Sequence, residues 1–142
     1  TDCMSESEPV LVAFLLSDSA IVEANTNKLS LIGCFSQFNL PVFPSTVASF
    51  YATIMLTNLG GATELAFSLQ IAEPKTGHIL CATSGKMERS GTGFDQDQYL
   101  EIPFPIPPVT FHQPGKYEIK LLLNGEEFTK RPITVNLLPK TK

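Results

Sequence analysis

Apolar residues recur at every second position on both sides of a short turn near the end of the chain, and this pattern limits the fold more than any other feature. The turn is Asn124-Gly125, a pair that takes the positive φ values a two-residue hairpin connection needs. A period of two places alternate side chains on one face of a strand. Residues 112–139 therefore predict an antiparallel hairpin, with inward side chains at Tyr117, Ile119, Leu121, Leu123, Ile133, Val135 and Leu137.

The rest of the chain divides into segments of strand length separated by turn signals. Residues 64–73 alternate cleanly, which predicts one buried face made of Leu65, Phe67, Leu69 and Ile71. Both faces of the segment 28–38 are partly apolar, so we expect that strand to be central in its sheet. The only helix candidate, residues 45–58, is rich in residues that favour strands. No helix is therefore expected.

Proline dominates the segment after the longest predicted loop. That loop, residues 88–98, holds two glycines and several small polar residues without any periodicity. Five prolines then lie within residues 103–114. Because proline cannot donate a hydrogen bond to a neighbouring strand, this segment must run along a sheet edge or form a polyproline-like strap.

These signals together predict an all-β fold. About eight strands spaced by roughly ten residues, without a βαβ pattern or internal repeat, indicate an immunoglobulin-like, two-sheet antiparallel β-sandwich. The Gly115-x-Tyr117 sequence resembles the corner tyrosine of such sandwiches, whose hydroxyl bonds back to the preceding connection. Trp is absent, and so is the paired-cysteine hallmark of true immunoglobulin domains. We expect one domain at 9–139, with tails at 1–8 and 140–142.

One position in the closing hairpin is out of phase. Phe128 has an even number, whereas Ile133 and Val135 on the same strand are odd, so a regular pleat would point Phe128 away from the core. A bulge or break near Lys130–Pro132 would restore its direction, and proline suits such a site. The sequence therefore predicts an irregularity there.

Several motifs spread along the chain resemble an uncharacterised bacterial family of small domains of unknown function. The family pattern combines Leu-x-x-Asp-x-Ala, Lys-Leu-x-x-x-Gly-x-Phe and a closing Gly-x-Tyr hairpin that ends in Asp-Gly-Glu. This chain has Ile119 where the family tends to have Phe, and Asn124 where it tends to have Asp. The resemblance implies a compact β-sandwich with no known activity and no catalytic residues. The matching residues are Leu15, Asp18, Ala20, Lys28, Leu29, Gly33, Phe35, Gly115, Tyr117, Leu121, Gly125 and Glu126.

Charge argues against nucleic acid and membrane partners. The net charge is −4, and Lys130–Arg131 is the only basic pair, so the basic patch of a nucleic-acid binder is missing and an acidic membrane surface would repel the chain. No apolar run reaches the 18 residues that a membrane span needs. The apolar run 10–16 follows an acidic stretch, which is unlike a secretory signal; processing before Thr1 stays open.

Cysteine usage favours a reducing compartment, hence a cytoplasmic location. Cys3, Cys34 and Cys81 are odd in number and lack a C-x-x-C spacing, which argues against a zinc site. We expect Cys34 and Cys81 to behave as free thiols within apolar strands. A disulfide between Cys34 and Cys81 is the alternative.

Signatures of catalysis are absent, so we expect neither enzymatic activity nor a cofactor. None of the nucleophile, phosphate-binding, dinucleotide or zinc-protease motifs is present. His78 and His112 each lie beside a turn residue, which favours a solvated role over general-base chemistry. Asp18 is expected to cap a turn, with ligand contact as the alternative. Glu88, Asp95, Asp97 and Glu101 could together form a calcium site, but we favour a solvated acidic loop for them.

The function that these features favour is a non-catalytic interaction or structural module with a protein partner. Its contact region would be the edge at 99–111 with the loop 88–98, through Phe94, Tyr99, Phe104 and Phe111. We favour packing beneath the loops for most of these aromatic residues, and the contact role concerns those that stay partly exposed. Lys130 and Arg131 would supply a basic contact. A small-molecule domain that binds a sugar or acyl ligand near Phe94 and Tyr99 is the second function, and a homodimer through an uncovered edge strand is the oligomer considered.

Overall fold

The structure is a computed structural model that describes residues 9–60, 64–88 and 98–139. Every regular element within these residues is a β-strand, and there are eleven. In chain order they are β1 (Val10–Val22), β2 (Leu29–Phe35), β3 (Gln37–Leu40), β4 (Ser45–Val47), β5 (Phe50–Thr57), β6 (Glu64–Ala72), β7 (Ile79–Glu88), β8 (Leu100–Ile106), β9 (Val109–Phe111), β10 (Gly115–Leu123) and β11 (Glu126–Leu137).

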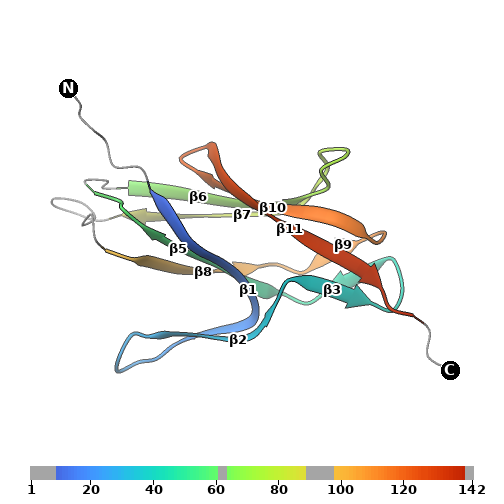
Figure 1. Cartoon of the computed structure of the whole chain (residues 1–142), viewed down its shortest axis with the longest axis horizontal. Coiled ribbons are helices and arrows are strands. Elements are labelled where there is room, and N and C mark those ends of the chain that lie inside the picture. The colour runs from blue at the N-terminus through green and yellow to red at the C-terminus, as the bar shows by residue number, and fades with distance from the viewer. Residues whose placement is uncertain (1–8, 61–63, 89–97, 140–142) are drawn as a thin grey trace.

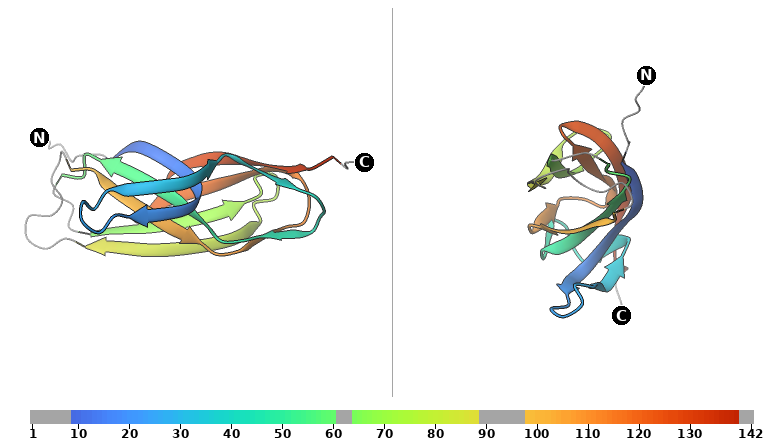
Figure 2. Two further views of the ribbon diagram at one scale, coloured as in Figure 1. Left: turned by 90° about the horizontal axis from the view of Figure 1, so that it is seen from below. Right: turned by 90° about the vertical axis from the view of Figure 1, so that its left-hand side faces the viewer.

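The strands form two large sheets that face each other and one small sheet (Figures 1 and 2). The first large sheet has four strands in the order β2-β1-β5-β8. The second has five, in the order β3-β11-β10-β6-β7, and β4 pairs with β9. Pairing is antiparallel except between β11 and β3, which run parallel where Thr134–Leu137 meet Gln37–Leu40. The fold is therefore all-β, with one parallel pair that the sequence did not predict.

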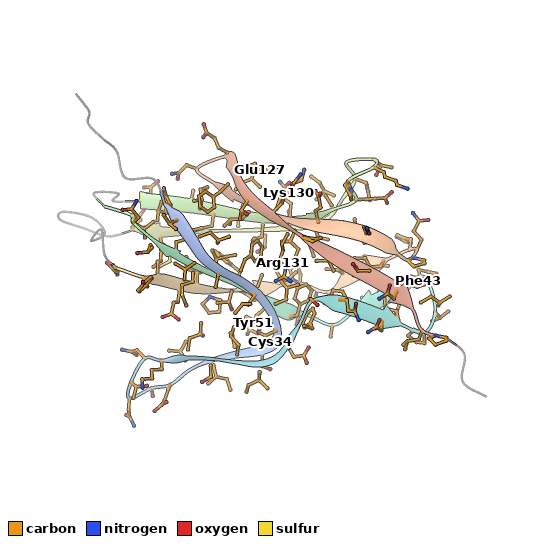
Figure 3. All side chains as sticks on the ribbon, viewed as in Figure 1. Cys34, Phe43, Tyr51, Glu127, Lys130 and Arg131 are labelled. Carbon is orange, nitrogen blue, oxygen red and sulfur yellow. The ribbon has the colours of Figure 1, made fainter. Side chains whose placement is uncertain are left out.

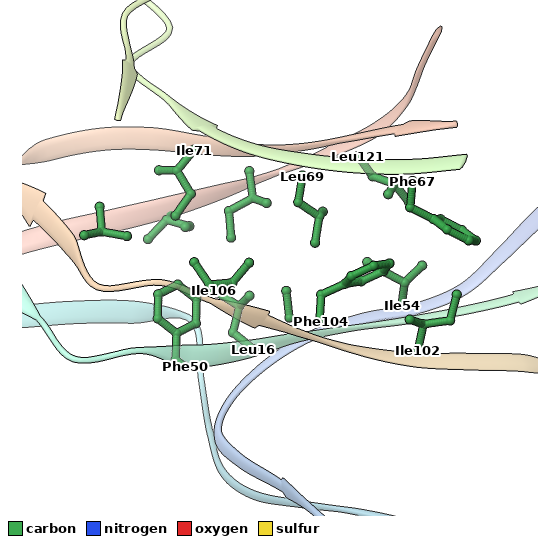
Figure 4. Packing of buried hydrophobic residues seen from close by; sticks show 14 of the residues in the cluster. Leu16, Phe50, Ile54, Phe67, Leu69, Ile71, Ile102, Phe104, Ile106 and Leu121 are labelled. Carbon is green, nitrogen blue, oxygen red and sulfur yellow. The ribbon is translucent and has the colours of Figure 1, made fainter. Parts of the chain in front are cut away.

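The core lies between the two large sheets (Figure 4). Strand β5 contributes Ala52, Ile54 and Leu56, none of which exposes any surface. The alternation predicted for residues 64–73 is confirmed, because its four inward side chains are each at most 3% exposed. Burying one such side chain stabilises the fold by roughly 1.5–3 kcal/mol. The four are Leu65, Phe67, Leu69 and Ile71.

The predicted number of strands, about eight, was too low. Three predicted segments each divide into two strands: residues 28–38 into β2 and β3, 46–58 into β4 and β5, and 99–111 into β8 and β9. In each case the second part joins a different sheet from the first. A bend at Ser36 separates β2 from β3, and the pair Pro107-Pro108 separates β8 from β9, whereas residue propensity alone shows one continuous strand in each case.

Strand β2 lies at an edge of its sheet, so its predicted central position was wrong. Its only neighbour within the sheet is β1. Phe35 packs against the core, whereas Ile32 is 52% exposed and Cys34 is exposed. One apolar face of β2 thus packs against the core, and the other is exposed on the molecular surface.

The prediction that the proline-rich segment follows an edge is confirmed for β8, the outermost strand beside β5. Pro103 and Pro105 alternate with the buried side chains Ile102, Phe104 and Ile106. Missing N–H groups on an edge strand hinder the addition of a further strand.

The closing hairpin forms as predicted, except that Leu137, expected to point inward, is 54% exposed at the end of β11. Its irregularity also lies elsewhere. Asn124 and Gly125 both have positive φ, at 51° and 87°. The ladder between β10 and β11 continues without a break from Thr129 to Val135, and Pro132 pairs with Glu118. The predicted break near Lys130–Pro132 was therefore wrong.

The register shifts instead at Phe128, where Leu121 pairs with Thr129 and Leu122 with Glu127. This one-residue bulge returns the Phe128 side chain toward the core, against which it packs. Pro132 fits within the regular strand because β3 pairs with β11 only from Thr134 onward. Before that point, β11 does not have to donate a main-chain hydrogen bond to β3.

Tyr117 forms the predicted corner. Its hydroxyl donates a 2.7 Å hydrogen bond to the main-chain oxygen of Gln113, and its ring packs on Phe111 with centroids 4.9 Å apart. Burial, and less strongly the nearby Glu73 carboxylate, raise the pKa of the Tyr117 phenol, although the bond to Gln113 opposes this. The hydrogen bond fixes the connection that leads into β10.

Candidate functional site

The outer faces of the two large sheets differ sharply in chemistry. On the five-stranded sheet, outward side chains carry charges that form ion pairs across neighbouring strands. Lys130 Nζ lies 3.7 Å from Glu118 Oε1, and Lys120 Nζ lies 3.8 Å from Glu127 Oε1. Nearby, Lys86 pairs with Glu64 and Glu88. This face is suited to water.

The four-stranded sheet turns an almost uncharged surface outward, which we call the apolar face. Strand pairing defines its rows: Ala13 lies opposite Met55, Leu15 opposite Thr53, and Ser17 between Cys34 and Tyr51. Val10, Val12, Leu15 and Ile32 are 43–52% exposed. The residues of the apolar face are Val10, Val12, Leu15, Ile32, Cys34, Tyr51, Met55, Pro103 and Pro105.

Glu101, opposite Met55, carries a charge on this face; Asp18, the other acid of these four strands, is exposed but follows Ser17 along β1 and so alternates to the opposite face. At the usual strand spacing and rise, the face measures roughly 500 Å². That is within the size of the largest apolar patch of typical monomers, which often serves binding. It is smaller than the roughly 800 Å² per partner of a standard stable interface.

Small polar groups lie buried beneath the apolar face. Ser17 exposes no surface, and its hydroxyl donates a 3.0 Å hydrogen bond to the main-chain oxygen of Ser19. Thr53 is 2% exposed, and its hydroxyl has no hydrogen-bond partner among the described residues. Strand pairing places Cys34 of β2 and Tyr51 of β5 on the two sides of Ser17. Figure 3 labels the side chains of Cys34 and Tyr51. The larger neighbours therefore shield polar atoms from water and leave an apolar exterior.

The structure separates the aromatic residues that the sequence grouped into one contact region. Tyr99 is 61% exposed, just before β8. Phe104 and Phe111 belong to the core, at 8% and 0% exposure, so they cannot contact a partner and the prediction for them was wrong. Alternation along β8 and β9 turns both rings inward. Phe94, and with it most of the predicted loop and the sugar or acyl pocket beside it, lies outside the described residues.

The basic pair divides between the outside and the inside of the molecule. Lys130 faces outward and pairs with Glu118. Arg131 lies opposite the buried Ile119, so its side chain points toward the other sheet. There it donates a 2.6 Å hydrogen bond to the main-chain oxygen of Phe14, and the guanidinium carbon lies 5.9 Å from the centre of the Phe14 ring.

Partial burial lowers the pKa of the Arg131 guanidinium from its ordinary value. The group therefore links β11 to β1 across the two large sheets (Figure 3). A residue engaged in this way cannot serve as the predicted basic contact, which leaves Lys130 alone of the pair on the surface.

Asp18 lies within β1 and does not cap a turn as predicted. Its carboxylate lies over Gly33 on β2, where an added Cβ would come within 2.5 Å of Asp18 Oδ2. Gly33 also has a φ of 71°, which disfavours any side chain. The two residues therefore depend on each other sterically.

Titratable groups do not gather into a reactive centre in the part of the chain that the structure describes. His78 and His112 are exposed and lie in different connections, just before β7 and before β10. No group of three or more His, Cys, Asp or Glu residues is close enough to hold a metal ion, among described residues only. Two acids of the weighed calcium cage, Asp95 and Asp97, lie outside those residues.

The two described cysteines are free thiols, so the alternative of a Cys34–Cys81 disulfide was wrong. They lie on edge strands of different sheets, β2 and β7. Cys34 is exposed on the apolar face. Partial burial raises the pKa of the Cys81 thiol, and a hydrogen bond with the main chain of Ile71 opposes this less strongly. In residues 9–60, 64–88 and 98–139, no helix is long and apolar enough to cross a membrane.

Sequence reasoning missed the apolar face because its residues look like core residues. The run 10–16 is apolar at odd and even positions alike, as expected when both faces of a strand leave water. In the structure, Phe14 and Leu16 serve the core while Leu15 is exposed. The available signal was the same double pattern in residues 29–35, which pair with this strand.

Two solved structures resemble the chain at low sequence identity. Over 93% of its length the chain resembles part of an alkylpurine DNA glycosylase, AlkC, from Pseudomonas fluorescens solved with DNA containing an abasic site analog, with 17% identity and a TM-score of 0.49. A glycosyl hydrolase family 2 member from Bacteroides cellulosilyticus matches over 67%, with 15% identity and a TM-score of 0.46. The chain spans only 31% and 14% of those two proteins.

No curated protein matches the chain. A family model, described as a family of unknown function (DUF6941), matches residues 12–136. This match covers all but the ends of the folded region, from β1 to β11. The expected membership of an uncharacterised family of small domains is thereby confirmed. The chain belongs to the family of unknown function DUF6941.

Proposed function

We propose that the protein is a non-catalytic interaction module that docks a protein partner on its apolar face. The observation that carries this proposal is the contrast between the two outer faces, one laced with ion pairs and the other nearly free of charge. Isolated exposed apolar residues are ordinary, but a continuous apolar sheet face beside a charged one favours binding.

The partner that suits this face presents an uncharged, apolar surface of its own. A charged partner surface would lose water on contact without gaining an opposite charge, because Glu101 is the one charge available. The modest size of the face favours a transient complex over a permanent one. Tyr51 and Met55 would be its central anchors, since large side chains near the middle of an interface contribute most to affinity.

We propose an immunoglobulin-like sandwich as the finer description of the fold. The Tyr117 corner bond to Gln113 and the two facing, mainly antiparallel sheets support it. We also propose a reducing, cytoplasmic setting in a bacterial cell, which the free thiols of Cys34 and Cys81 support. The net charge of −4 supports a partner other than nucleic acid or an acidic membrane.

Paired substitutions test the docking proposal. Leu15→Glu and Ile32→Glu each place a carboxylate on the apolar face, whereas Leu122→Glu makes the same change on the outer face of the five-stranded sheet. We expect the first two to reduce partner capture at least tenfold and Leu122→Glu to retain it, with circular dichroism confirming that all three fold. Retained capture by both apolar-face variants would sink the proposal.

A size measurement examines the homodimer. If the partner is a second copy, light scattering on the purified chain should give twice the monomer mass, and Leu15→Glu should restore the monomer. A dimer that persists in Leu15→Glu would instead place the contact at an uncovered edge, such as β7.

A further inference from the structure

A cavity of about 400 Å³ lies at the end of the five-stranded sheet, away from the apolar face. One wall is the turn after β6, with Glu73, Pro74 and Lys75. The other wall leads into β10 and includes Pro114 and Lys116. The volume is within the range of small-molecule sites.

The cavity exists because two neighbouring strands separate. The ladder between β6 and β10 ends at the pair Ala72–Glu118. Pro74 follows directly and cannot donate a main-chain hydrogen bond, so the next rung cannot form in full. Beyond Ala72 the chain turns into the β6–β7 connection, while β10 continues toward Gly115 alongside β11.

The interrupted ladder leaves main-chain groups of Lys116 facing the cavity. Asn124 N donates to Ala66 O, which marks that pair as hydrogen-bonded. Hydrogen-bonded pairs alternate along an antiparallel ladder. If the ladder continued in the same register, Lys116 and Pro74 would therefore be the next hydrogen-bonded pair. Among the described residues, no main-chain hydrogen bond joins these two.

Both walls are held in place before any ligand arrives. In the β6–β7 turn, Gly77 N donates to Glu73 O at 2.8 Å, and His78 N donates to Thr76 Oγ1 at 3.2 Å. On the other side, the Tyr117 hydroxyl bond to Gln113 fixes the segment before β10. Preorganised walls reduce the entropy that binding costs.

The lining combines flat apolar groups with positive charge. Pro74 and Pro114 offer exposed apolar surfaces against which a flat body can pack, and Tyr117, only 3% exposed, lines the cavity from the core side. Lys75 and Lys116 bring two ammonium groups, against the single carboxylate of Glu73. A free main-chain N–H beside two ammonium groups suits a carboxylate.

We propose that this cavity binds a small amphipathic carboxylate, an anionic group on a flat apolar body. The carboxylate accepts a hydrogen bond from Lys116 N and is attracted by the ammonium groups of Lys75 and Lys116. The apolar body packs against Pro74 and Pro114. The cavity is separate from the apolar face, so a result that refutes one of the two proposals leaves the other untouched.

Titration with 2-naphthoate, followed by amide chemical shifts in ¹H–¹⁵N spectra, tests this site. We expect saturable shifts at Gly115, Lys116 and the turn 75–77, with a Kd on the order of 1 mM for a ligand of this size. The neutral isostere 2-naphthamide should bind at least about fivefold more weakly, since it lacks the charge.

Charge substitutions give opposite expected signs. Lys75→Gln and Lys116→Gln should each weaken 2-naphthoate binding about threefold or more, whereas Glu73→Gln should tighten it. Lys28→Gln is the matched control, because Lys28 ends the corresponding β1–β2 turn, where Glu23 N donates to Lys28 O. It should leave the Kd unchanged.

Three results would overturn the proposal. The first is the absence of shifts at these residues up to 20-fold above the expected Kd. The second is equal binding of 2-naphthoate and 2-naphthamide. The third is weakening by Glu73→Gln or by Lys28→Gln as large as that by Lys116→Gln. Unchanged melting temperatures of the variants would exclude unfolding as the cause of any lost binding.

Discussion

Replacing Arg131 by methionine removes the guanidinium that joins the two large sheets while it keeps much of the side-chain stem. In the native chain this group donates to Phe14 O at 2.6 Å and lies 5.9 Å from the Phe14 ring centre. The matched change is Lys130→Met, one residue earlier, where the ammonium lies on the surface and pairs with Glu118 at 3.7 Å. Both variants lose one positive charge, so overall charge cannot distinguish them.

The expected cost of Arg131→Met follows from these contacts. A hydrogen bond to a charged donor contributes about 1.5–3 kcal/mol, and a cation over an aromatic ring about 0.5–1 kcal/mol. Relief from desolvation of the charged group offsets part of this, so we expect a net loss of about 1–2 kcal/mol. The exposed pair of Lys130 should be worth no more than about 0.5 kcal/mol.

Urea unfolding followed by circular dichroism, together with a thermal melt, measures both values. A 142-residue domain loses about 3 °C in Tm for each kcal/mol. Arg131→Met should therefore melt about 3–6 °C below the native chain, and Lys130→Met within about 2 °C of it. If the two variants lose the same stability, the inter-sheet role of Arg131 is wrong.

Three further predictions concern the strands and their thiols. Gly33→Ala should destabilise the fold by about 1–2 kcal/mol, because the added Cβ would meet the Asp18 carboxylate. Asp18→Ala should recover part of this loss. Additive effects of the two substitutions in a double-mutant cycle would contradict the contact. Tyr117→Phe should cost about 1 kcal/mol.

Because the pKa of Tyr117 is raised in the fold, its contribution should be full below the ordinary value of 10.0 and lost as the pH rises through the raised value; a Tyr117→Phe variant with the same alkaline decline in Tm would refute this. In a variant with Cys3 replaced by serine, Cys34 and Cys81 are the two thiols that can react. Cys34 should react with a thiol reagent at pH 8 well before Cys81, whose pKa is raised by burial. Equal rates would contradict the placement.

Local chemistry was enough to predict the elements whose two faces meet different surroundings. Strand β6 alternates because one face packs in the core and the other carries polar groups. The closing hairpin was predicted from its Asn124-Gly125 turn, and the Tyr117 bond from the sequence around the corner. In each case the decisive interactions lie within a few residues of the signal.

Prediction was wrong where the outcome depends on distant neighbours. An apolar residue gives the same signal whether it faces the core or an exposed sheet surface, so Ile32 was placed in a central strand and Leu15 escaped notice. Phe104 and Phe111 were considered for a contact surface because they lie in the proline-rich segment. Strand alternation and the opposite sheet decide their burial, and neither is visible in composition.

The phase of Phe128 shows what a pattern can and cannot locate. The mismatch with Ile133 required an irregularity, and one exists. Proline suggested its position, but the pairing partners of β11 on both sides determine where a bulge is tolerated. A sequence pattern can thus predict that a shift of register occurs while leaving its site to tertiary structure.

Site-specific photocrosslinking from Tyr51 tests most directly whether the apolar face is a docking surface. Tyr51 is replaced by benzoylphenylalanine, which preserves an aromatic ring near the middle of the face, and Ser68 on the outer face of the five-stranded sheet receives the same probe. In native extract, the Tyr51 probe should give discrete crosslinked products that Leu15→Glu abolishes, and the Ser68 probe should give none. Equal products from both probes, or none from Tyr51, would contradict the account.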